Sequence, residues 1–358
     1  MARPGEFTQR AYLNGKMDLS QAEAVADLIA SSNKATHDIA MSQLRGHFSS
    51  ELARLRDQLL KLTSLLELEL DFSDHEDLEF ADRTELLSLA QEIDSRVMHL
   101  AQSFETGQAL KQGIPVAIVG KTNVGKSTLL NQLVGDDRAI VSDIHGTTRD
   151  TIEETMEING VQFRFIDTAG LRQTSDEVEQ IGIERTYAAI QKARIVLWLF
   201  DEMPSVEEES DMLKRCAQKA LIPILNKVDS GETGTKADSK KPCTSSTCPS
   251  VPPVLKISAK LGRALSDLKL CIFDQAKNLG LIANSSDVIV TNARHYDALS
   301  RAHSHLQRVI SGLQIQLSGD LLSEDLRQAL DTLSEITGGL ITPQETLNSI
   351  FNHFCVGK

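Results

Sequence analysis

Residues 114–127 read Ile114-Pro115-Val116-Ala117-Ile118-Val119-Gly120-Lys121-Thr122-Asn123-Val124-Gly125-Lys126-Ser127. The first part is an apolar run typical of a buried strand, and the part from Gly120 onward fits the pattern G-x-x-x-x-G-K-[ST]. A second apolar run at 129–133 is expected to be a helix, which completes the strand, loop and helix of a P-loop. The glycines let backbone N–H groups close around phosphates, and the helix N-terminus attracts negative charge. We therefore expect Lys126 to reach the β- and γ-phosphates of a nucleotide and Ser127 to bind Mg²⁺.

Strand and helix patterns alternate from this loop to about residue 276. Further strands are expected at 153–158, 161–166, 195–200, 221–225 and 254–257. The first two of these are expected to form a hairpin across Asn159-Gly160. The pattern predicts a doubly wound, mostly parallel sheet with one antiparallel edge over residues 113–277. Within it, 230–253 is rich in Gly, Ser, Thr, Lys and Pro and is interpreted as a surface insertion.

Helical patterns flank this α/β region on both sides. Residues 1–16 are expected to be an irregular lead-in, followed by a helix that Asp18 and Gln21 begin with a capping box. Longer helices are expected at 34–70 and 82–111, joined by a solvated acidic connection, and further helices from Thr291 to about 315, from Ser323 and from Pro343. The fold class predicted is an α/β P-loop domain inserted into an α-helical domain. The domains expected are 17–112, 113–277 and 278–358, with 1–16 outside them.

Bulk composition narrows the class of protein. The chain has 358 residues, 41% hydrophobic and 24% charged, as in a soluble protein of two or three domains. Its net charge of -13 argues against a broad basic face for nucleic acid. The five cysteines form no C-x-x-C pair, so neither a zinc site nor a disulfide framework is indicated. Without a membrane-spanning apolar run or a signal-peptide core, the expected location is the cytoplasm of a bacterium, or the mitochondrion in a eukaryote.

Four further motifs point to a guanine nucleotide. Asp167-Thr168-Ala169-Gly170 follows an expected strand and is placed for the Mg²⁺ second shell and the γ-phosphate, and Gly146-Thr147-Thr148 precedes another, with Thr148 expected to close on Mg²⁺ and γ-phosphate. In Asn226-Lys227-Val228-Asp229 the Asp229 carboxylate can accept from the two edge donors of guanine, and the Ala259 N–H of Ser258-Ala259-Lys260 can meet its O6. Adenine would leave the Asp229 acceptor unpaired, so GTP is predicted and ATP excluded.

The residues that drive hydrolysis are less defined by pattern. Leu171 stands where many regulatory GTPases carry a glutamine that orients the attacking water, and leucine cannot do this. Either hydrolysis is very slow, or another polar group replaces the glutamine; Asp176, Glu177 and Glu179, which lie just beyond, can each supply one. Charge on the transition state could come from Arg149, from Arg172 or from a monovalent cation held by the side-chain oxygen of Asn123.

The chain resembles the tRNA uridine-modification GTPases known as the MnmE (TrmE) family. The likeness extends over essentially the whole chain. It includes Arg3-Pro4-Gly5-Glu6-Phe7, Asn14-Gly15-Lys16-Met17-Asp18-Leu19, Gln21-Ala22-Glu23-Ala24, the nucleotide motifs, Asp176-Glu177-Val178-Glu179-Gln180-Ile181-Gly182-Ile183-Glu184-Arg185 and Phe354-Cys355-Val356-Gly357-Lys358.

The resemblance implies a potassium-activated GTPase and assigns its site residues. Glu179, Lys126 and Thr148 are implied as catalytic, with Mg²⁺ at Ser127 and Thr148 and K⁺ at Asn123, Ser142, Ile144 and Thr147. The implied GTP contacts are Asn123, Val124, Gly125, Lys126, Ser127, Thr128, Ser142, Asp143, Ile144, His145, Gly146, Thr147, Thr148, Asp167, Thr168, Ala169, Gly170, Asn226, Lys227, Asp229, Ser258, Ala259 and Lys260.

The resemblance also implies partners. In the family, G domains pair in a homodimer when GTP and K⁺ are bound. The flavoprotein MnmG joins it in a heterotetramer that modifies C5 of the tRNA wobble uridine with an aminomethyl or carboxymethylaminomethyl group, and that partner would supply much of the tRNA contact. The one-carbon unit comes from 5-formyl- or methylene-tetrahydrofolate, and Lys16 and Lys358 match folate-contacting positions. Family members begin with a folate-binding domain, of which we expect residues 1–16 to be the remnant. In the family, the terminal Cys-x-Gly-Lys points back to the folate site, and Cys355 could be a nucleophile or a packing thiol.

Two other functions fit the nucleotide motifs. A ribosome-assembly or regulatory GTPase would share them, but such proteins usually carry a basic RNA-binding module, which this acidic sequence lacks. A truncated homologue that folds without modifying tRNA is the other alternative.

Overall fold

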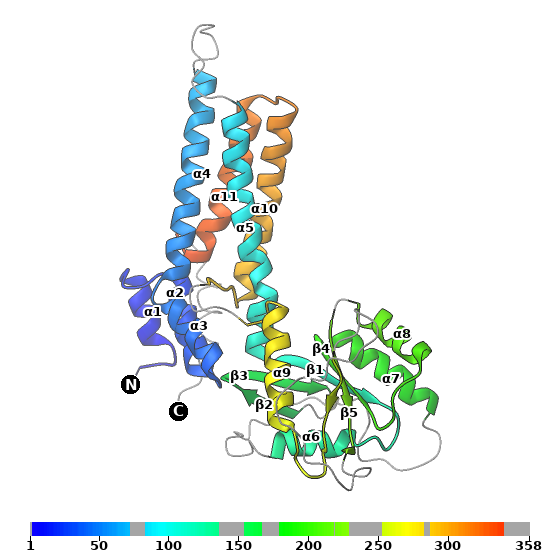
Figure 1. The fold of residues 1–358 in the computed structure, drawn as a ribbon. Coiled ribbons are helices and arrows are strands. Elements are labelled where there is room, and N and C mark those ends of the chain that lie inside the picture. The colour runs from blue at the N-terminus through cyan, green and yellow to red at the C-terminus, as the bar shows by residue number, and fades with distance from the viewer. Residues whose placement is uncertain are drawn as a thin grey trace. The chain divides into compact units, whose positions relative to one another are not determined.

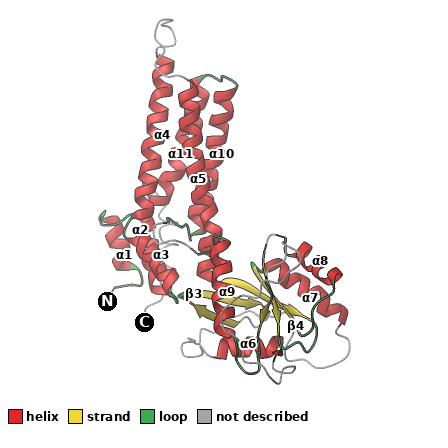
Figure 2. Ribbon diagram, in the orientation of Figure 1, coloured by secondary structure: helices red, strands yellow, loops and turns green. Residues whose placement is uncertain are grey.

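A computed structural model of the chain describes residues 2–71, 83–135, 154–166, 179–217, 219–228, 253–282 and 287–339. Contacts divide the chain into two compact units, one comprising Met1–Lys111 and Ala283–Lys358 and the other Gln112–Ile282. In the described residues the first unit is built from helices, and the second is a sheet with helices on its faces (Figures 1 and 2).

The second unit contains one six-stranded sheet. Its strands are β1 (Ile114–Gly120), β2 (Glu154–Ile158), β3 (Val161–Ile166), β4 (Ile195–Phe200), β5 (Ala220–Leu225) and β6 (Leu255–Lys256). They lie in the order β2-β3-β1-β4-β5-β6, and every neighbouring pair is parallel except β2 with β3. This confirms the predicted doubly wound, mostly parallel sheet with one antiparallel edge.

Helices cover both faces of this sheet, as Figure 2 shows. They are α6 (Lys126–Gly135), α7 (Glu179–Lys192), α8 (Val206–Arg215) and α9 (Leu265–Asn278). On one face, Ile190 of α7 and Met212 of α8 belong to the apolar cluster that contains Val196 and Trp198 of β4. Every residue of β4 is buried, as expected of a central parallel strand between two helical layers.

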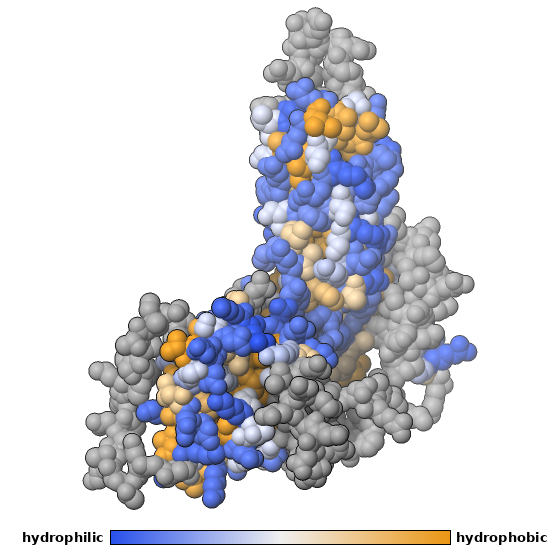
Figure 3. Space-filling view, turned by 90° about the vertical axis from the view of Figure 1, so that its right-hand side faces the viewer, coloured by the Kyte–Doolittle hydropathy of each residue, from blue (hydrophilic) through white to orange (hydrophobic). Residues whose placement is uncertain are grey.

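The helical unit buries one long apolar core. Its helices are α1 (Glu6–Leu13), α2 (Leu19–Ala30), α3 (Lys34–Leu44), α4 (His47–Asp71), α5 (Arg83–Gln112), α10 (Ala293–Gln314) and α11 (Gly319–Thr337). Leu59 of α4, Ile93 of α5, Leu306 of α10 and Leu326 of α11 are all fully buried in that core. Each long helix turns an apolar stripe inward, and the surface these helices present to solvent is mostly hydrophilic (Figure 3).

The expectation of an irregular lead-in at 1–16 was wrong, because Glu6–Leu13 is a helix. Its N-terminus is stabilised by Glu6, whose carboxylate accepts the Arg3 N–H (2.6 Å) and also pairs with Arg10 one turn later. Acidic side chains are favourable in the first turn of a helix. An acidic residue at a helix start is a signal that the sequence carries at Glu6, but Pro4-Gly5 and Asn14-Gly15 on either side favoured an irregular segment.

The single helix predicted for 34–70 was also wrong. The structure has two helices, α3 and α4, separated at Gly46, whose φ of 84° lies in the left-handed region that helices cannot continue through. Gln21 of α2 donates from Nε2 to the Leu44 carbonyl at the end of α3 (3.0 Å). A side chain of the preceding helix therefore binds the end of α3 at the break.

Two helix starts differ from prediction. Asn292, and not Thr291, is the N-cap of α10, because its Oδ1 accepts the Arg294 N–H (2.9 Å). Helix α11 begins at Gly319, so Ser323 lies inside it. The expected helix at 82–111 is present as α5, whereas the helix expected from Pro343 and most of the acidic connection lie outside the described residues.

Candidate nucleotide-binding site

Three of the predicted motifs begin at one edge of the sheet in the described residues. Because β1, β4, β5 and β6 are parallel neighbours, their carboxyl ends lie at the same edge. The loop after β1 begins the P-loop, the loop after β5 begins with Asn226, and Ser258 follows β6. Doubly wound sheets bind ligands in the crevice at these ends.

The P-loop backbone requires its two glycines. Gly120 and Gly125 have φ of 155° and 99°, and a Cβ on them would lie 2.3 Å from the Leu199 carbonyl oxygen and 2.4 Å from Asn226 Nδ2. Asn123 also has a positive φ, of 61°. Both positions therefore exclude a side chain, because Gly120 is packed against β4 and Gly125 against Asn226. We call this tightly bent loop the glycine cradle; loops of this kind bind phosphates through their backbone N–H groups.

Lys126 is the first residue of α6 and bends back over the loop. Its Nζ donates to the carbonyl oxygens of Gly120 (2.8 Å) and Lys121 (2.6 Å). Ser127 and Thr128 follow in the first turn of α6, where backbone N–H groups have no partner within the helix. The arrangement presents a cation, a hydroxyl and helix N–H donors together, a set suited to a phosphate with Mg²⁺.

Asn226 joins three of the motifs. Its side chain is buried, with Nδ2 donating to the Val124 carbonyl of the P-loop (2.8 Å) and Oδ1 accepting the Ala259 N–H (2.9 Å). Both ends of the amide are thus engaged in holding loops that come from β1, β5 and β6. One buried side chain therefore sets the spacing between the phosphate-binding and base-binding loops.

The loop after β6 is ordered around Ser258. Its buried hydroxyl accepts the Leu261 N–H (3.4 Å), and its backbone forms a bridge with Arg263. Lys260 beside it is exposed. The Ala259 N–H donates to Asn226 Oδ1, so its predicted hydrogen bond to guanine O6 would have to share this donor.

Several predicted site residues lie outside the described residues. They are Ser142, Asp143, Ile144, His145, Gly146, Thr147, Thr148, Arg149, Asp167, Thr168, Ala169, Gly170, Arg172, Asp176, Glu177, Asp229, Cys355 and Lys358. Glu179 is the first residue of α7, and its side chain is likewise outside the description. Lys16 is exposed in the loop between α1 and α2.

Two carboxylates near the motifs were missed from the sequence. Asp201 directly follows β4 and accepts from Lys227 Nζ (2.9 Å), which lowers the pKa of Asp201. Glu208 of α8 pairs with Lys121 Nζ (2.7 Å), and this contact together with the Ser205 N–H lowers the pKa of Glu208. The same pair raises the pKa of Lys121. A sequence signal existed only for Glu208, which stands three residues after the helix-capping Ser205.

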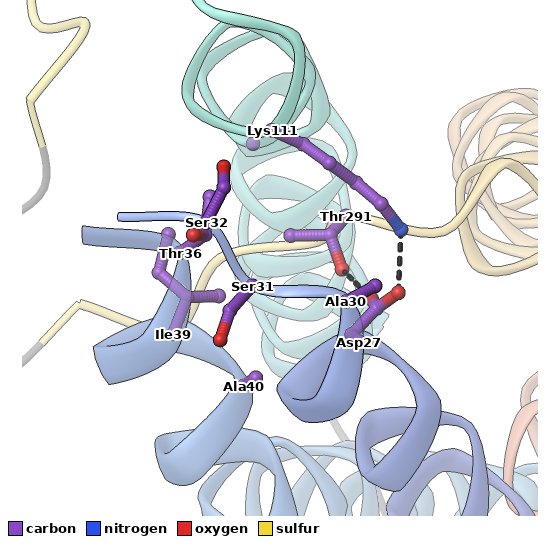
Figure 4. A pocket seen from close by; sticks show the side chains of 10 residues that line it. Asp27, Ala30, Ser31, Ser32, Thr36, Ile39, Ala40, Lys111 and Thr291 are labelled. Atoms are coloured by element: carbon purple, nitrogen blue, oxygen red, sulfur yellow. Dashed lines mark hydrogen bonds and ion pairs between the residues drawn. The ribbon is translucent and has the colours of Figure 1, made fainter. Parts of the chain in front are cut away.

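The helical unit has a pocket of its own. It lies among α2, α3, α5 and the segment before α10, and its polar lining includes Asp27, Ser31, Lys111 and Thr291 (Figure 4). Asp27 accepts from Lys111 Nζ (2.5 Å) and from Thr291 Oγ1 (3.2 Å), so its charge is already compensated.

Among the described residues, no helix has both the length and the apolar character needed to cross a bilayer.

Comparison with known proteins places the chain in a family. The family model described as the MnmE helical domain matches residues 19–355. The tRNA modification GTPase MnmE of Phocaeicola vulgatus is 54% identical over 362 residues, covering 100% of this chain and 71% of the relative. The chain belongs to the MnmE family.

Other relatives with the MnmE name agree with this membership. The protein of Porphyromonas gingivalis is 52% identical, with 100% of this chain and 76% of the relative covered, and that of Bacteroides thetaiotaomicron is 50% identical, with 100% and 77% covered. A solved structure of Aquifex aeolicus Era is 25% identical, covers 53% of this chain and 66% of Era, and has a TM-score of 0.33. A TM-score this low does not support any conclusion about this chain's fold or function from its likeness to Era.

Proposed function

We propose that this MnmE-family chain is a GTP hydrolase that acts in the modification of tRNA, at C5 of the wobble uridine, with the flavoprotein MnmG as its partner. The observation that carries the proposal is Asn226, which joins the P-loop to the Ala259 loop within a matched set of GTPase motifs. The family name and the relatives' printed activity, tRNA modification GTPase, support the biological role.

Binding of the triphosphate falls to the P-loop and the start of α6. Backbone N–H groups of the glycine cradle and Lys126 would hold the β- and γ-phosphates, and Ser127 with Thr148 would hold Mg²⁺. When bound, Mg²⁺ neutralises charge on the β- and γ-oxygens. The hydroxyl of Ser127 and the ammonium of Lys126 fit this role because both belong to the first turn of the helix.

Selection of guanine falls to the loops that Asn226 holds together. Asp229 lies three residues beyond Asn226, and its carboxylate would accept from both guanine edge donors. An adenine base would leave that acceptor without donors in a desolvated site, which costs about 1–3 kcal/mol or more. Lys227 between them has a left-handed φ of 62°, so the loop is tightly bent before Asp229.

Hydrolysis is assigned to Glu179 and to a bound K⁺. Glu179 at the start of α7 would orient the attacking water, a role that Leu171 cannot fill. Asn123, Ser142, Ile144 and Thr147 would hold K⁺, which when bound supplies positive charge to the transition state. The positive φ of Asn123 supports this assignment, because it bends the loop backbone beside the phosphate-binding glycines.

Cation dependence tests the catalytic part of the proposal. We expect GTP hydrolysis in K⁺ and little in Na⁺ at equal ionic strength, because the smaller ion does not match the same oxygen ligands. Initial rates of phosphate release in the two salts, with fluorescent-nucleotide binding measured in each, give the comparison. Equal rates at equal nucleotide occupancy would remove Asn123 from the proposed mechanism.

Modification of tRNA tests the biological part. The chain is expressed in a bacterial strain that lacks this GTPase, and the wobble uridines are analysed by mass spectrometry. Restored C5 modification supports the proposed function, whereas GTP hydrolysis without modification would favour a truncated homologue. Association with ribosomal particles instead would favour an assembly GTPase. Dimerisation and tetrahydrofolate binding, with Lys16 and Lys358 as proposed contacts, are measured on the same purified chain.

A further inference from the structure

Two carboxylates follow β4, and each pairs with a lysine of a neighbouring nucleotide motif: Glu208 with Lys121 of the P-loop and Asp201 with Lys227 of the loop after β5. In the sheet, β4 lies between β1 and β5, with Gly120 paired to Leu199 and Phe200 paired to Leu225. Lys121 follows β1 and Lys227 follows β5, so the two lysines belong to the P-loop and to the base-binding loop. Glu208 pairs with Lys121 at 2.7 Å, and Asp201 pairs with Lys227 at 2.9 Å.

Glu208 is held rigidly by its own helix. The Ser205 N–H donates to Glu208 Oε2 (3.1 Å), and the Glu208 N–H donates to Ser205 Oγ (3.3 Å), which is a complete capping box at the start of α8. The other oxygen, Oε1, receives Lys121. One oxygen of the Glu208 carboxylate is therefore held by the helix cap, and the other pairs with Lys121.

Asp201 binds the side chain of Lys227, the residue of the base-binding loop that directly follows Asn226. Asn226 fixes the loop through buried hydrogen bonds of its side chain, and the next residue, Lys227, turns into the left-handed region. A positive φ at a residue other than glycine costs free energy and needs support from its surroundings. The surroundings hold the Lys227 side chain through Asp201, and the N–H of the next residue, Val228, donates to the Ile257 carbonyl (3.5 Å).

We propose that Asp201 is a positioning residue for the guanine nucleotide, because it holds Lys227 and thereby the loop that leads to Asp229. Glu208 is paired with Lys121 of the P-loop and takes no part in this role. The inference rests on the proposed GTP-binding function. Ordering the loop before the nucleotide arrives removes part of the entropy cost of binding, so the contribution falls on affinity. Neither carboxylate reaches the hydrolysed bond through these contacts, so the rate at saturation is independent of them.

The test compares Asp201→Asn with wild type by titration of a fluorescent GTP analogue and by steady-state GTP hydrolysis. Both ion-pair partners are partly exposed, which limits the pair to a modest effect, and we expect Kd and KM to rise about three- to fivefold with kcat unchanged. Asp201→Glu should restore much of the loss. At about 1 M KCl the difference should shrink, because the screening length falls to about 3 Å.

Glu207→Gln is the matched control. It removes one negative charge from the first turn of α8, and Glu207 is exposed. If Asp201 acted only through its negative charge, both variants would bind GTP more tightly, since the site would become more positive. Tighter binding by Asp201→Asn, or no change in it, would overturn the positioning role.

A double-mutant cycle completes the test. In a Lys227→Met background, Asp201→Asn should cause no further loss of affinity, because the partner is already absent. An undiminished loss there would overturn the inference. Failure of wild type to bind GTP at all would instead contradict the proposed function, so the two failures are distinct. Unfolding temperatures of all variants, expected within a few degrees of wild type, exclude misfolding as the cause of weaker binding.

Discussion

Gly125 shows how much a single residue contributes to the proposed nucleotide site. Its φ of 99° is unfavourable for any L-residue, and an added Cβ would lie 2.4 Å from Nδ2 of Asn226, the side chain that joins the loops. We expect Gly125→Ala to weaken GTP binding about ten- to a hundredfold, since backbone strain and loss of the Asn226 contact together cost on the order of 1–3 kcal/mol. Titration with a fluorescent GTP analogue measures the loss.

Gly135→Ala is the control for that substitution. Gly135 is the last residue of α6, and an added Cβ there would meet nothing within 4 Å. GTP affinity within twofold of wild type is expected for this variant. Equal losses at both glycines would mean that the P-loop glycine has no special role.

Glu179 carries a second prediction at this scale. Removing one positioned catalytic group should lower kcat of Glu179→Ala by on the order of ten- to a thousandfold while GTP still binds. The comparison variant is Glu157→Ala, which removes an exposed carboxylate from β2. Single-turnover hydrolysis at saturating GTP separates the two, and a near-normal rate for Glu179→Ala would exclude it from the mechanism.

At the scale of elements, three helices meet at one buried carboxylate. Glu23 of α2 receives both Nε (3.0 Å) and Nη2 (3.1 Å) of Arg294 and also pairs with His295 (2.7 Å) of α10. Arg294 in turn donates from Nη1 to the Glu335 carbonyl (2.7 Å) and from Nη2 to the Ile336 carbonyl (3.0 Å) at the end of α11. Because the last carbonyls of a helix lack intrahelical partners, this guanidinium stabilises the end of α11.

Removing the charge of Glu23 should therefore destabilise the helical unit. Glu23→Gln leaves Arg294, whose side chain is 26% exposed, without its carboxylate, and we expect the free energy of unfolding to fall by about 2 kcal/mol at neutral pH. Urea unfolding followed by circular dichroism measures it. The control is Glu335→Gln, whose partner Arg301 is half-exposed, so that loss should stay below about 1 kcal/mol.

The same carboxylate gives a pH dependence of known sign. Burial alone would raise the pKa of Glu23, but the hydrogen bond from His295 and the charges of His295 and Arg294 outweigh it, so the pKa is lowered. A carboxyl with a lowered folded pKa contributes stability that is present above its unfolded value of about 4.3 and is lost as pH falls through the folded value. Wild type should lose stability in that acid range more steeply than Glu23→Gln, and parallel curves would contradict the assignment.

At the scale of the whole molecule, the chain leaves the helical unit after Lys111 and returns to it at 283. Asp27 of α2 holds both passages within the helical unit, Lys111 by one oxygen and Thr291 by the other (Figure 4). Gln43 and Gln108 add hydrogen bonds to the Ile289 carbonyl (2.8 Å) and the Thr291 carbonyl (3.0 Å). Side chains of α2 and α3, together with Gln108 of α5, thus secure the two segments through which the second unit is inserted.

Asp27→Ala should loosen both segments together. Amide hydrogen exchange is expected to accelerate severalfold in residues 108–111 and also in 287–292, because a segment opens more readily once the side chain that anchors it is gone. Thr291→Val, which removes only one of the two hydrogen bonds to Asp27, should affect mainly 287–292. Acceleration confined to a single segment in Asp27→Ala would show that the passages are held independently.

The sequence by itself determined what depends on near neighbours along the chain. The P-loop pattern, the strands of the sheet and the hairpin across Asn159-Gly160 all follow from local spacing and from turn residues, and the structure has these strands within one or two residues of their predicted ends. Hydrophobic periodicity also predicted α5 and most of α10, although it did not show the break between α3 and α4. These features need no knowledge of which distant segments meet.

Only the tertiary structure decided the contacts between distant segments. Asn226 bonds to a residue 102 positions away and Glu23 to one 271 positions away, and no local pattern indicates either partner. Gln21 lies beside the end of α3, Thr291 turns to Asp27 and leaves the helix cap to Asn292, and Asp201 reaches Lys227 across neighbouring strands. The physical reason is that a polar side chain takes whichever partner the folded chain brings within about 3 Å, and that choice depends on the path of the whole chain.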